Sequence, residues 1–134
     1  MSGKQKTIRL RGTVISGTGE AGGITELGWV KKQFVEKLGI HPYPGTFNIK
    51  VLSEDMAKLN TIRQAKGIEI TPLKAGYCPG LSFLALVDGK IKGAVIIPCV
   101  PNYPAAQLEI IAAENVRQAL SVKDGDVVEV EVYL

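Results

Sequence analysis

Only one segment of this chain has the length and apolar spacing of a helix that could connect two parallel strands. It begins after Thr25, which can cap the helix, and it ends at Gly39. Its apolar stripe consists of Leu27, Val30, Phe34 and Leu38, at spacings of 3, 4 and 4. Because every parallel connection needs such a crossover, an array of βαβ units is excluded. We therefore predict a mainly β chain that forms a small closed or partly closed barrel with one main helix.

Most other regular segments alternate polar and apolar residues with the period of two that is typical of half-buried strands. We predict strands over residues 7–16, 46–51, 68–73, 81–87, 91–100, 108–112 and 127–134. Asp88-Gly89 lies between two of them, and this dipeptide favours a tight hairpin turn. Residues 53–65 and 114–120 have the pattern of short helices, so strands dominate the predicted fold.

Composition restricts the functional classes without choosing among them. The 134 residues have the length of one domain, which we expect to span residues 1–134, and the net charge of +3 is scattered along the chain. Such a charge suits a small anionic ligand as well as it suits nucleic acid. A zinc site is excluded because His41 is the only histidine and Cys78 and Cys99 stand far apart. We expect both cysteines to be reduced, buried thiols in a cytoplasmic protein.

A glycine-rich segment follows the first predicted strand. Residues 17–23 contain four glycines in seven positions, so they form a loop with an exposed backbone. Backbone N–H groups in such a loop bind anions, and the predicted helix that follows favours a phosphate at its N-terminus. The segment lacks the Gly-Lys-Ser/Thr of a P-loop, and a glycine-rich hairpin that binds nothing remains the alternative.

The segment from His41 to Lys50 combines a stiff arm with a strand. Two prolines restrict the backbone of the arm, and a glycine then permits a turn. In the strand that follows, Thr46 and Asn48 share one face, which we expect to be the solvent face. Two neutral oxygens suit a magnesium ion that keeps several waters and binds a phosphate. The alternative is an exposed strand edge that hydrogen-bonds to water.

Three segments together resemble a known family. Residues 12–20, residues 42–49 with the sequence Pro-Tyr-Pro-Gly-Thr-Phe-Asn-Ile, and residues 108–112 leading to 122–128 resemble the archaeal CTP-dependent riboflavin kinases, in that order. The Pro-Tyr-Pro-Gly-Thr-Phe-Asn segment is the specific part of the match. The resemblance implies a small six-stranded cradle-loop (RIFT-like) barrel. It also implies a magnesium-dependent transfer of a phosphoryl group from CTP to riboflavin, which gives FMN.

The resemblance further implies roles for individual residues. It places nucleotide-binding residues at Thr18, Gly19, Glu20, Ala21, Gly22, Gly23, Glu114, Asn115, Val116 and Arg117. It places the magnesium ligands at Thr46 and Asn48, the pair that the strand pattern identified. It places a flavin-side carboxylate at Glu109, which would orient the acceptor hydroxyl and accept its proton. Without the resemblance, Glu109 would be interpreted as an idle, solvated carboxylate. Arg117 would be either a contact to a phosphate or a base edge or a solvated charge on a short helix.

Two positions depart from the pattern of the family. Ala21 stands where relatives commonly have a glycine, and the two glycines after it can compensate by shifting the turn. Pro101 stands where relatives place a hydroxyl residue against the flavin. We therefore expect Asn102 or Tyr103 to make the flavin contact.

Three functions remain open from the sequence. The first is a kinase for riboflavin or for a different small alcohol, with CTP as donor and magnesium as cofactor. The second is a barrel that binds a nucleotide or a flavin without transfer, and the third is a barrel that binds nucleic acid. For the kinase we expect a cytoplasmic monomer that acts on small molecules and has no membrane association, because no apolar run approaches the roughly 18 residues that a span requires.

Overall fold

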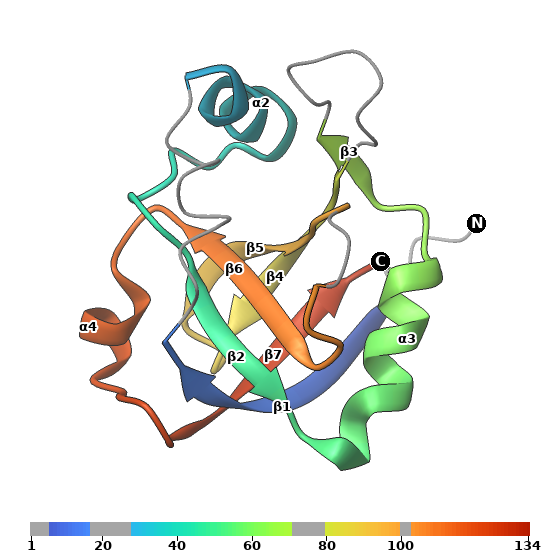
Figure 1. Ribbon diagram of the computed structural model, residues 1–134. Helices are drawn as coiled ribbons and strands as arrows, with labels where there is room; N and C mark the ends of the chain where they lie inside the picture. The colour runs from blue at the N-terminus through green and yellow to red at the C-terminus, as the bar shows by residue number, and fades with distance from the viewer. Residues whose placement is uncertain (1–5, 17–27, 71–79, 100–102) are drawn as a thin grey trace.

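The computed structural model describes residues 6–16, 28–70, 80–99 and 103–134 (Figure 1). Its strands are β1 (Thr7–Ile15), β2 (Phe47–Val51), β3 (Ile68–Ile70), β4 (Gly80–Val87), β5 (Ile91–Ile97), β6 (Gln107–Ala112) and β7 (Val127–Tyr133). They form one antiparallel sheet in the order β3-β4-β5-β6-β2-β1-β7, and an additional pairing between β4 and β7 closes it. Six strands therefore form a closed barrel, as predicted, and β3 lies outside it on β4.

The predicted strands are present, and most of their limits differ from the prediction by no more than one residue, except at the ends of β5 and β3. β5 ends at Ile97 instead of residue 100, because Pro98 follows it and has no backbone N–H to donate to the sheet. β3 ends at Ile70, and the rest of the predicted strand lies outside the described residues. The predicted hairpin turn is confirmed, since Asp88 and Gly89 have φ values of 50° and 66°.

The barrel interior is filled by the inward-facing residues of alternate strand positions. The largest of its fully buried strand residues are Leu10, Val14, Ile49, Val87, Val95, Leu108, Ile110 and Val128. Burying each such side chain stabilises the fold by about 1.5–3 kcal/mol relative to leaving it exposed. The interior is therefore a packed core, and any ligand must bind at its rim or outside it.

Helix α2 (Gly28–Leu38) covers the outer face of part of the barrel. Its buried residues Phe34 and Leu38 belong to a second apolar cluster. Ile111 of β6 is part of this cluster, because its side chain points away from the barrel interior. The helix ends as predicted at Gly39, where φ is +69° and the N–H of Ile40 donates to the carbonyl of Phe34. The predicted cap and the first residue of the apolar stripe lie outside the described residues.

Two further helices lie on opposite sides of the barrel in Figure 1. The first is α3 (Met56–Gln64), which follows the 3₁₀ turn η1 (Ser53–Asp55), and the second is α4 (Val116–Leu120). α4 starts two residues later than predicted, because the side chain of Asn115 caps it by accepting from the N–H of Gln118 at 3.2 Å. None of the helices in the described ranges is long and apolar enough to cross a membrane.

One expectation about the cysteines is wrong. Cys99 is disulfide-bonded and exposed, so it is neither a reduced thiol nor buried. It lies just beyond the end of β5, where two prolines in residues 98–101 interrupt the sheet pattern. The other cysteine of the chain, Cys78, lies outside the described residues.

Candidate functional site

The arm, residues 41–45, lies against the end of β6. The backbone N–H of Tyr43 donates to the carbonyl of Ala112 at 2.8 Å. Gly45 has a φ of +89°, a value that a residue with a Cβ rarely adopts, which confirms the predicted role of this glycine in the turn. Tyr43 is exposed, so it does not pack in the core. The arm therefore fixes the position of Thr46, the residue immediately before β2.

Thr46, the residue before β2, and Asn48 share one face, as predicted, but that face is only partly open to solvent: Thr46 is half-buried and Asn48 is buried. Asn48 is only 6% exposed, and its side chain is hydrogen-bonded to Thr46 on one side and to Gln107 on the other. Its Nδ2 donates to the carbonyl oxygen and to the Oγ1 of Thr46, both at 3.1 Å. The alternative of an exposed strand edge that bonds to water is therefore wrong for Asn48.

Glu109 lies directly opposite Asn48 in the pairing of β2 with β6. Its carboxylate accepts a hydrogen bond from the Thr46 hydroxyl at 3.0 Å and another from the Tyr103 hydroxyl. The residue is 4% exposed, so the interpretation as an idle, solvated carboxylate is excluded. No cation pairs with it among the residues that the structure describes.

Gln107 completes this cluster, and the sequence interpretation missed it. Its Nε2 donates to the Oδ1 of Asn48 at 3.1 Å. It lies two positions before Glu109 in β6, so both side chains are on the same face of the strand. That spacing is the signal that could have identified it, once β2 and β6 were known to be neighbours. The five residues Tyr103, Glu109, Thr46, Asn48 and Gln107 form one hydrogen-bonded chain, which we call the polar wall.

A cavity of about 140 Å³ opens on one side of the polar wall. We call it the arm cavity, and it is lined by Tyr43, Pro44, Gly45, Thr46, Phe47, Ile110, Ala112, Glu114, Asn115, Val116 and Arg117. The predicted nucleotide-binding residues at the start of α4 are thus brought next to Thr46. Residues that lie about 70 positions apart in the sequence therefore face the same space.

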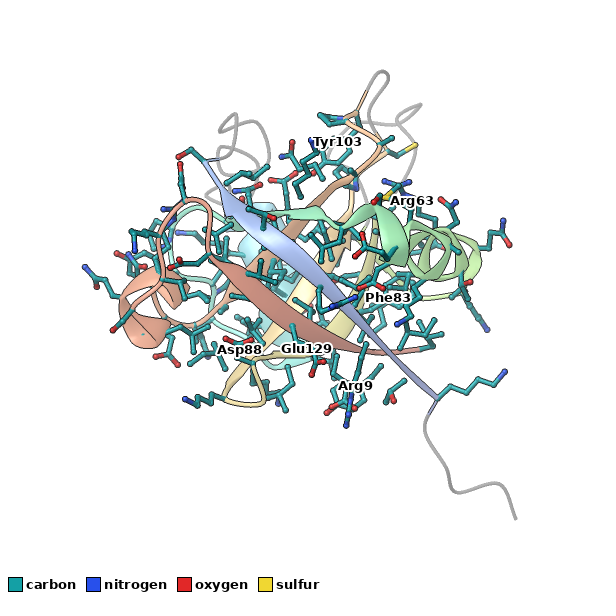
Figure 2. The ribbon with its side chains drawn as sticks, turned by 90° about the horizontal axis from the view of Figure 1, so that it is seen from below. Arg9, Arg63, Phe83, Asp88, Tyr103 and Glu129 are labelled. Carbon is teal, nitrogen blue, oxygen red and sulfur yellow. The ribbon has the colours of Figure 1, made fainter. Side chains whose placement is uncertain are left out.

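A second cavity, of about 410 Å³, is lined by the two end residues of the polar wall, Tyr103 and Gln107. We call it the Arg63 cavity, and it is lined by Arg63, Ile96, Ile97, Pro98, Tyr103, Ala105 and Gln107. Figure 2 shows Arg63 and Tyr103 on one side of the molecule, away from Asp88 and Glu129. Because Tyr103 and Gln107 line this cavity while Thr46 lines the arm cavity, the polar wall connects the two spaces.

Arg117 is held at the edge of the arm cavity. One of its guanidinium nitrogens donates to the carbonyl of Ile15 at 3.0 Å and to the carboxylate of Asp124. The hydroxyl of Ser16 donates to the same carboxylate at 2.9 Å. The hydrogen bond from Arg117 holds the pKa of Asp124 below its usual value, and the one from Ser16 adds to this effect. The end of β1 and the start of α4 are thereby joined beside the arm cavity.

Several predicted site residues lie outside the described residues, namely Thr18, Gly19, Glu20, Ala21, Gly22, Gly23 and Asn102, together with Pro101. Lys50, a further residue on the face of Thr46 and Asn48, is exposed. Of the predicted flavin contacts, the structure describes Tyr103 and Glu109, and the hydroxyl of Tyr103 donates a hydrogen bond to the carboxylate of Glu109.

The residues present fit the magnesium ion that the resemblance implies. No group of three or more His, Cys, Asp or Glu side chains suited to a metal occurs in the described part of the chain, so a site built from protein charges is absent there. Thr46 Oγ1 donates one hydrogen bond and accepts one, and Asn48 Oδ1 accepts one, so each oxygen keeps a lone pair. Two neutral oxygens suit magnesium, which takes its remaining ligands from waters and substrate phosphates.

Comparison with known proteins identifies the family of the chain. The model of the family CTP-dep_RFKase, described as "Domain of unknown function DUF120", matches residues 14–132. Proteins named riboflavin kinase match 96% of the chain, from Archaeoglobus fulgidus at 40% identity, Pyrobaculum arsenaticum at 38% and Ignicoccus hospitalis at 37%. The chain spans 56%, 62% and 73% of the lengths of these three relatives. The matched residues include the arm, β2, β6 and α4, and the chain therefore belongs to the CTP-dependent riboflavin kinase family.

Proposed function

We propose that this chain transfers the γ-phosphoryl group of CTP to the terminal ribityl hydroxyl of riboflavin, giving FMN and CDP, with magnesium. The observation that carries the proposal is the buried carboxylate of Glu109, which accepts from the hydroxyl of Thr46, a residue that lines one cavity, and from that of Tyr103, which lines the other. Phosphoryl transfer depends on positioning and on charge stabilisation more than on covalent chemistry, so the side chains of the polar wall can support it without a covalent nucleophile.

The donor nucleotide occupies the arm cavity in this proposal. Asn115, Val116 and Arg117 lie beside Thr46 there, so they can contact the nucleotide while its phosphates point toward Thr46 and Asn48. Those two residues would hold magnesium, which supplies positive charge to the phosphate oxygens when it is bound. The preference for CTP over other nucleotides is supported by the name of the family model.

Riboflavin occupies the Arg63 cavity in this proposal, next to Tyr103 and Gln107 of the polar wall. The apolar lining of this cavity, Ile96, Ile97 and Pro98, suits a flat aromatic ring. Tyr103 lines the same cavity and is hydrogen-bonded to Glu109. The Glu109 carboxylate orients the acceptor hydroxyl and takes its proton. The hydroxyl oxygen then bonds to the γ-phosphorus, and the bond from that phosphorus to the β-phosphate oxygen breaks, which releases CDP.

The test is an incubation of the purified chain with riboflavin and each of the four nucleoside triphosphates in turn, with magnesium or with EDTA. FMN is separated from riboflavin by chromatography and measured by fluorescence. We expect FMN with CTP and magnesium, much less FMN with the other nucleotides, and none with EDTA. Absence of FMN with all four nucleotides would overturn the proposal.

A further inference from the structure

Gln107 is a buried polar residue that the proposed chemistry does not use. It is the first residue of β6 and is 7% exposed. Its Nε2 donates to Asn48 Oδ1 at 3.1 Å, and its side chain also lines the Arg63 cavity. A buried amide of this kind is costly unless its hydrogen bonds are satisfied, so its contact with Asn48 constrains both side chains.

The hydrogen bonds of the polar wall run in one direction from Gln107. Gln107 donates to Asn48, Asn48 donates to Thr46, and Thr46 donates to Glu109. The Nδ2 of Asn48 also donates to the carbonyl of Thr46, so the carboxamide has one favourable orientation, with Oδ1 toward Gln107. Reversal of the carboxamide would place Oδ1 against the carbonyl and Nδ2 against the donor of Gln107.

We propose that Gln107 is a positioning residue that holds the carboxamide of Asn48 with Oδ1 oriented for magnesium. This inference rests on the proposed function, because it assigns Gln107 to the same metal pair. Residues that hydrogen-bond to metal ligands fix the orientation of those ligands, and their loss typically weakens metal affinity by about 10–100-fold. Since Gln107 bonds to one of the two proposed ligands, the expected loss is at the lower end, about 10-fold.

The experiment compares wild type with Gln107→Met, which keeps the length of the side chain and removes its donor. Gln107→His is the conservative variant, because a ring N–H can still donate toward Asn48. Gln33→Met is the matched control, since Gln33 is a buried glutamine on α2 outside the polar wall. Binding of β,γ-methylene CTP is measured by calorimetry over a magnesium titration, and the side-chain amide signals of Asn48 are recorded by NMR without metal.

We expect Gln107→Met to need about 10-fold more magnesium for half-maximal nucleotide binding and to shift or broaden the Asn48 amide signals. Gln107→His should recover most of the magnesium affinity, and Gln33→Met should match wild type in both measurements. Unchanged magnesium dependence and unchanged Asn48 signals in Gln107→Met would overturn the inference. If Gln107→Met does not fold, the inference requires an altered Asn48 signal or magnesium dependence in Gln107→His, and wild-type behaviour in both would overturn it.

The two proposals can fail separately. If wild type binds the nucleotide in a magnesium-dependent way but makes no FMN, the proposed transfer is wrong, and the magnesium titration still decides the role of Gln107. If wild-type binding of the nucleotide does not depend on magnesium, the role of Gln107 toward a metal is overturned, whether or not FMN forms.

Discussion

Asp55 and Glu109 are two buried carboxylates with opposite surroundings. Asp55 is 3% exposed and accepts from the backbone N–H of Arg11 at 2.8 Å, with the Arg11 guanidinium at 3.4 Å and the Lys58 ammonium at 3.6 Å. Glu109 is 4% exposed, and its hydrogen-bond donors among the described residues are the neutral hydroxyls of Thr46 and Tyr103.

The difference supports the proposed role of Glu109 in the chemistry over a similar role for Asp55. The backbone N–H of Arg11 is the main reason that the pKa of Asp55 lies below its usual value, and the nearby Lys58 and Arg11 charges contribute to it. Asp55 thus joins β1 to the start of α3, a structural role. Around Glu109, a substrate hydroxyl can replace a neutral donor without breaking an ion pair. Both carboxylates are buried, so burial does not distinguish them. They differ in that Asp55 has charged partners and Glu109 has neutral ones.

The largest expected effect comes from exchanging each carboxylate for its amide. Glu109→Gln should lower kcat for FMN formation by about 10²–10⁴-fold, because the amide cannot accept the proton of the acceptor. Asp55→Asn should retain the wild-type kcat per folded molecule. Steady-state assays normalised to the folded fraction from circular dichroism measure both. Equal losses of kcat in the two variants would remove the distinction between these carboxylates.

The next largest effect is expected at the proposed magnesium ligands, Thr46 and Asn48. Thr46→Ala and Asn48→Ala should each raise the magnesium concentration needed for half-maximal turnover by about 10–100-fold, because each removes one of two protein oxygens. Lys92→Ala, a change at an exposed position of β5 that lines neither cavity, is the control. Full magnesium-dependent turnover in both alanine variants would show that the pair does not bind the metal.

A smaller effect, on stability, is expected from Asp55→Asn. The amide keeps the size of the side chain but loses the charge that faces Arg11 and Lys58. The melting temperature at pH 7 should fall by about 5 °C, while Glu109→Gln should change it less. Differential scanning calorimetry of both variants checks this, and the reverse order would contradict the structural role of Asp55.

The smallest expected effect is the pH dependence of the difference in melting temperature between wild type and Asp55→Asn. Because the pKa of Asp55 is lowered in the folded state, its stabilising contribution is present above its usual pKa of 3.8 and is lost as the pH falls through the lower folded value. The gap in melting temperature between wild type and Asp55→Asn should therefore narrow below about pH 4. A gap that stays constant down to pH 2 would contradict the assignment.

The strand pattern and the turn chemistry predicted most of the fold. Asp88-Gly89 set the hairpin, Gly39 ended α2, and the lack of further crossover helices left a barrel. These features are local, so a single sequence contains them. The disulfide at Cys99 was missed, because cysteine spacing does not reveal which residues meet in space.

The site was only partly predictable. Thr46 and Asn48 could be paired because they are two residues apart on one strand. The bonds of Glu109 to Thr46 and of Gln107 to Asn48 depend on the register between β2 and β6, about 60 residues away in the chain. The contact that covers Asn48 has the same origin, since Gln107 reaches it from β6. Local patterns do not specify such a register, and the family resemblance supplied Glu109.

The central claim is that Glu109 acts on the acceptor during transfer. Its most direct test is a single-turnover measurement, with excess chain, saturating CTP and magnesium, and limiting riboflavin, in wild type and Glu109→Gln. We predict that FMN forms at least about 100-fold more slowly in the variant although riboflavin is fully bound. Formation of FMN at the wild-type rate by Glu109→Gln would contradict the account.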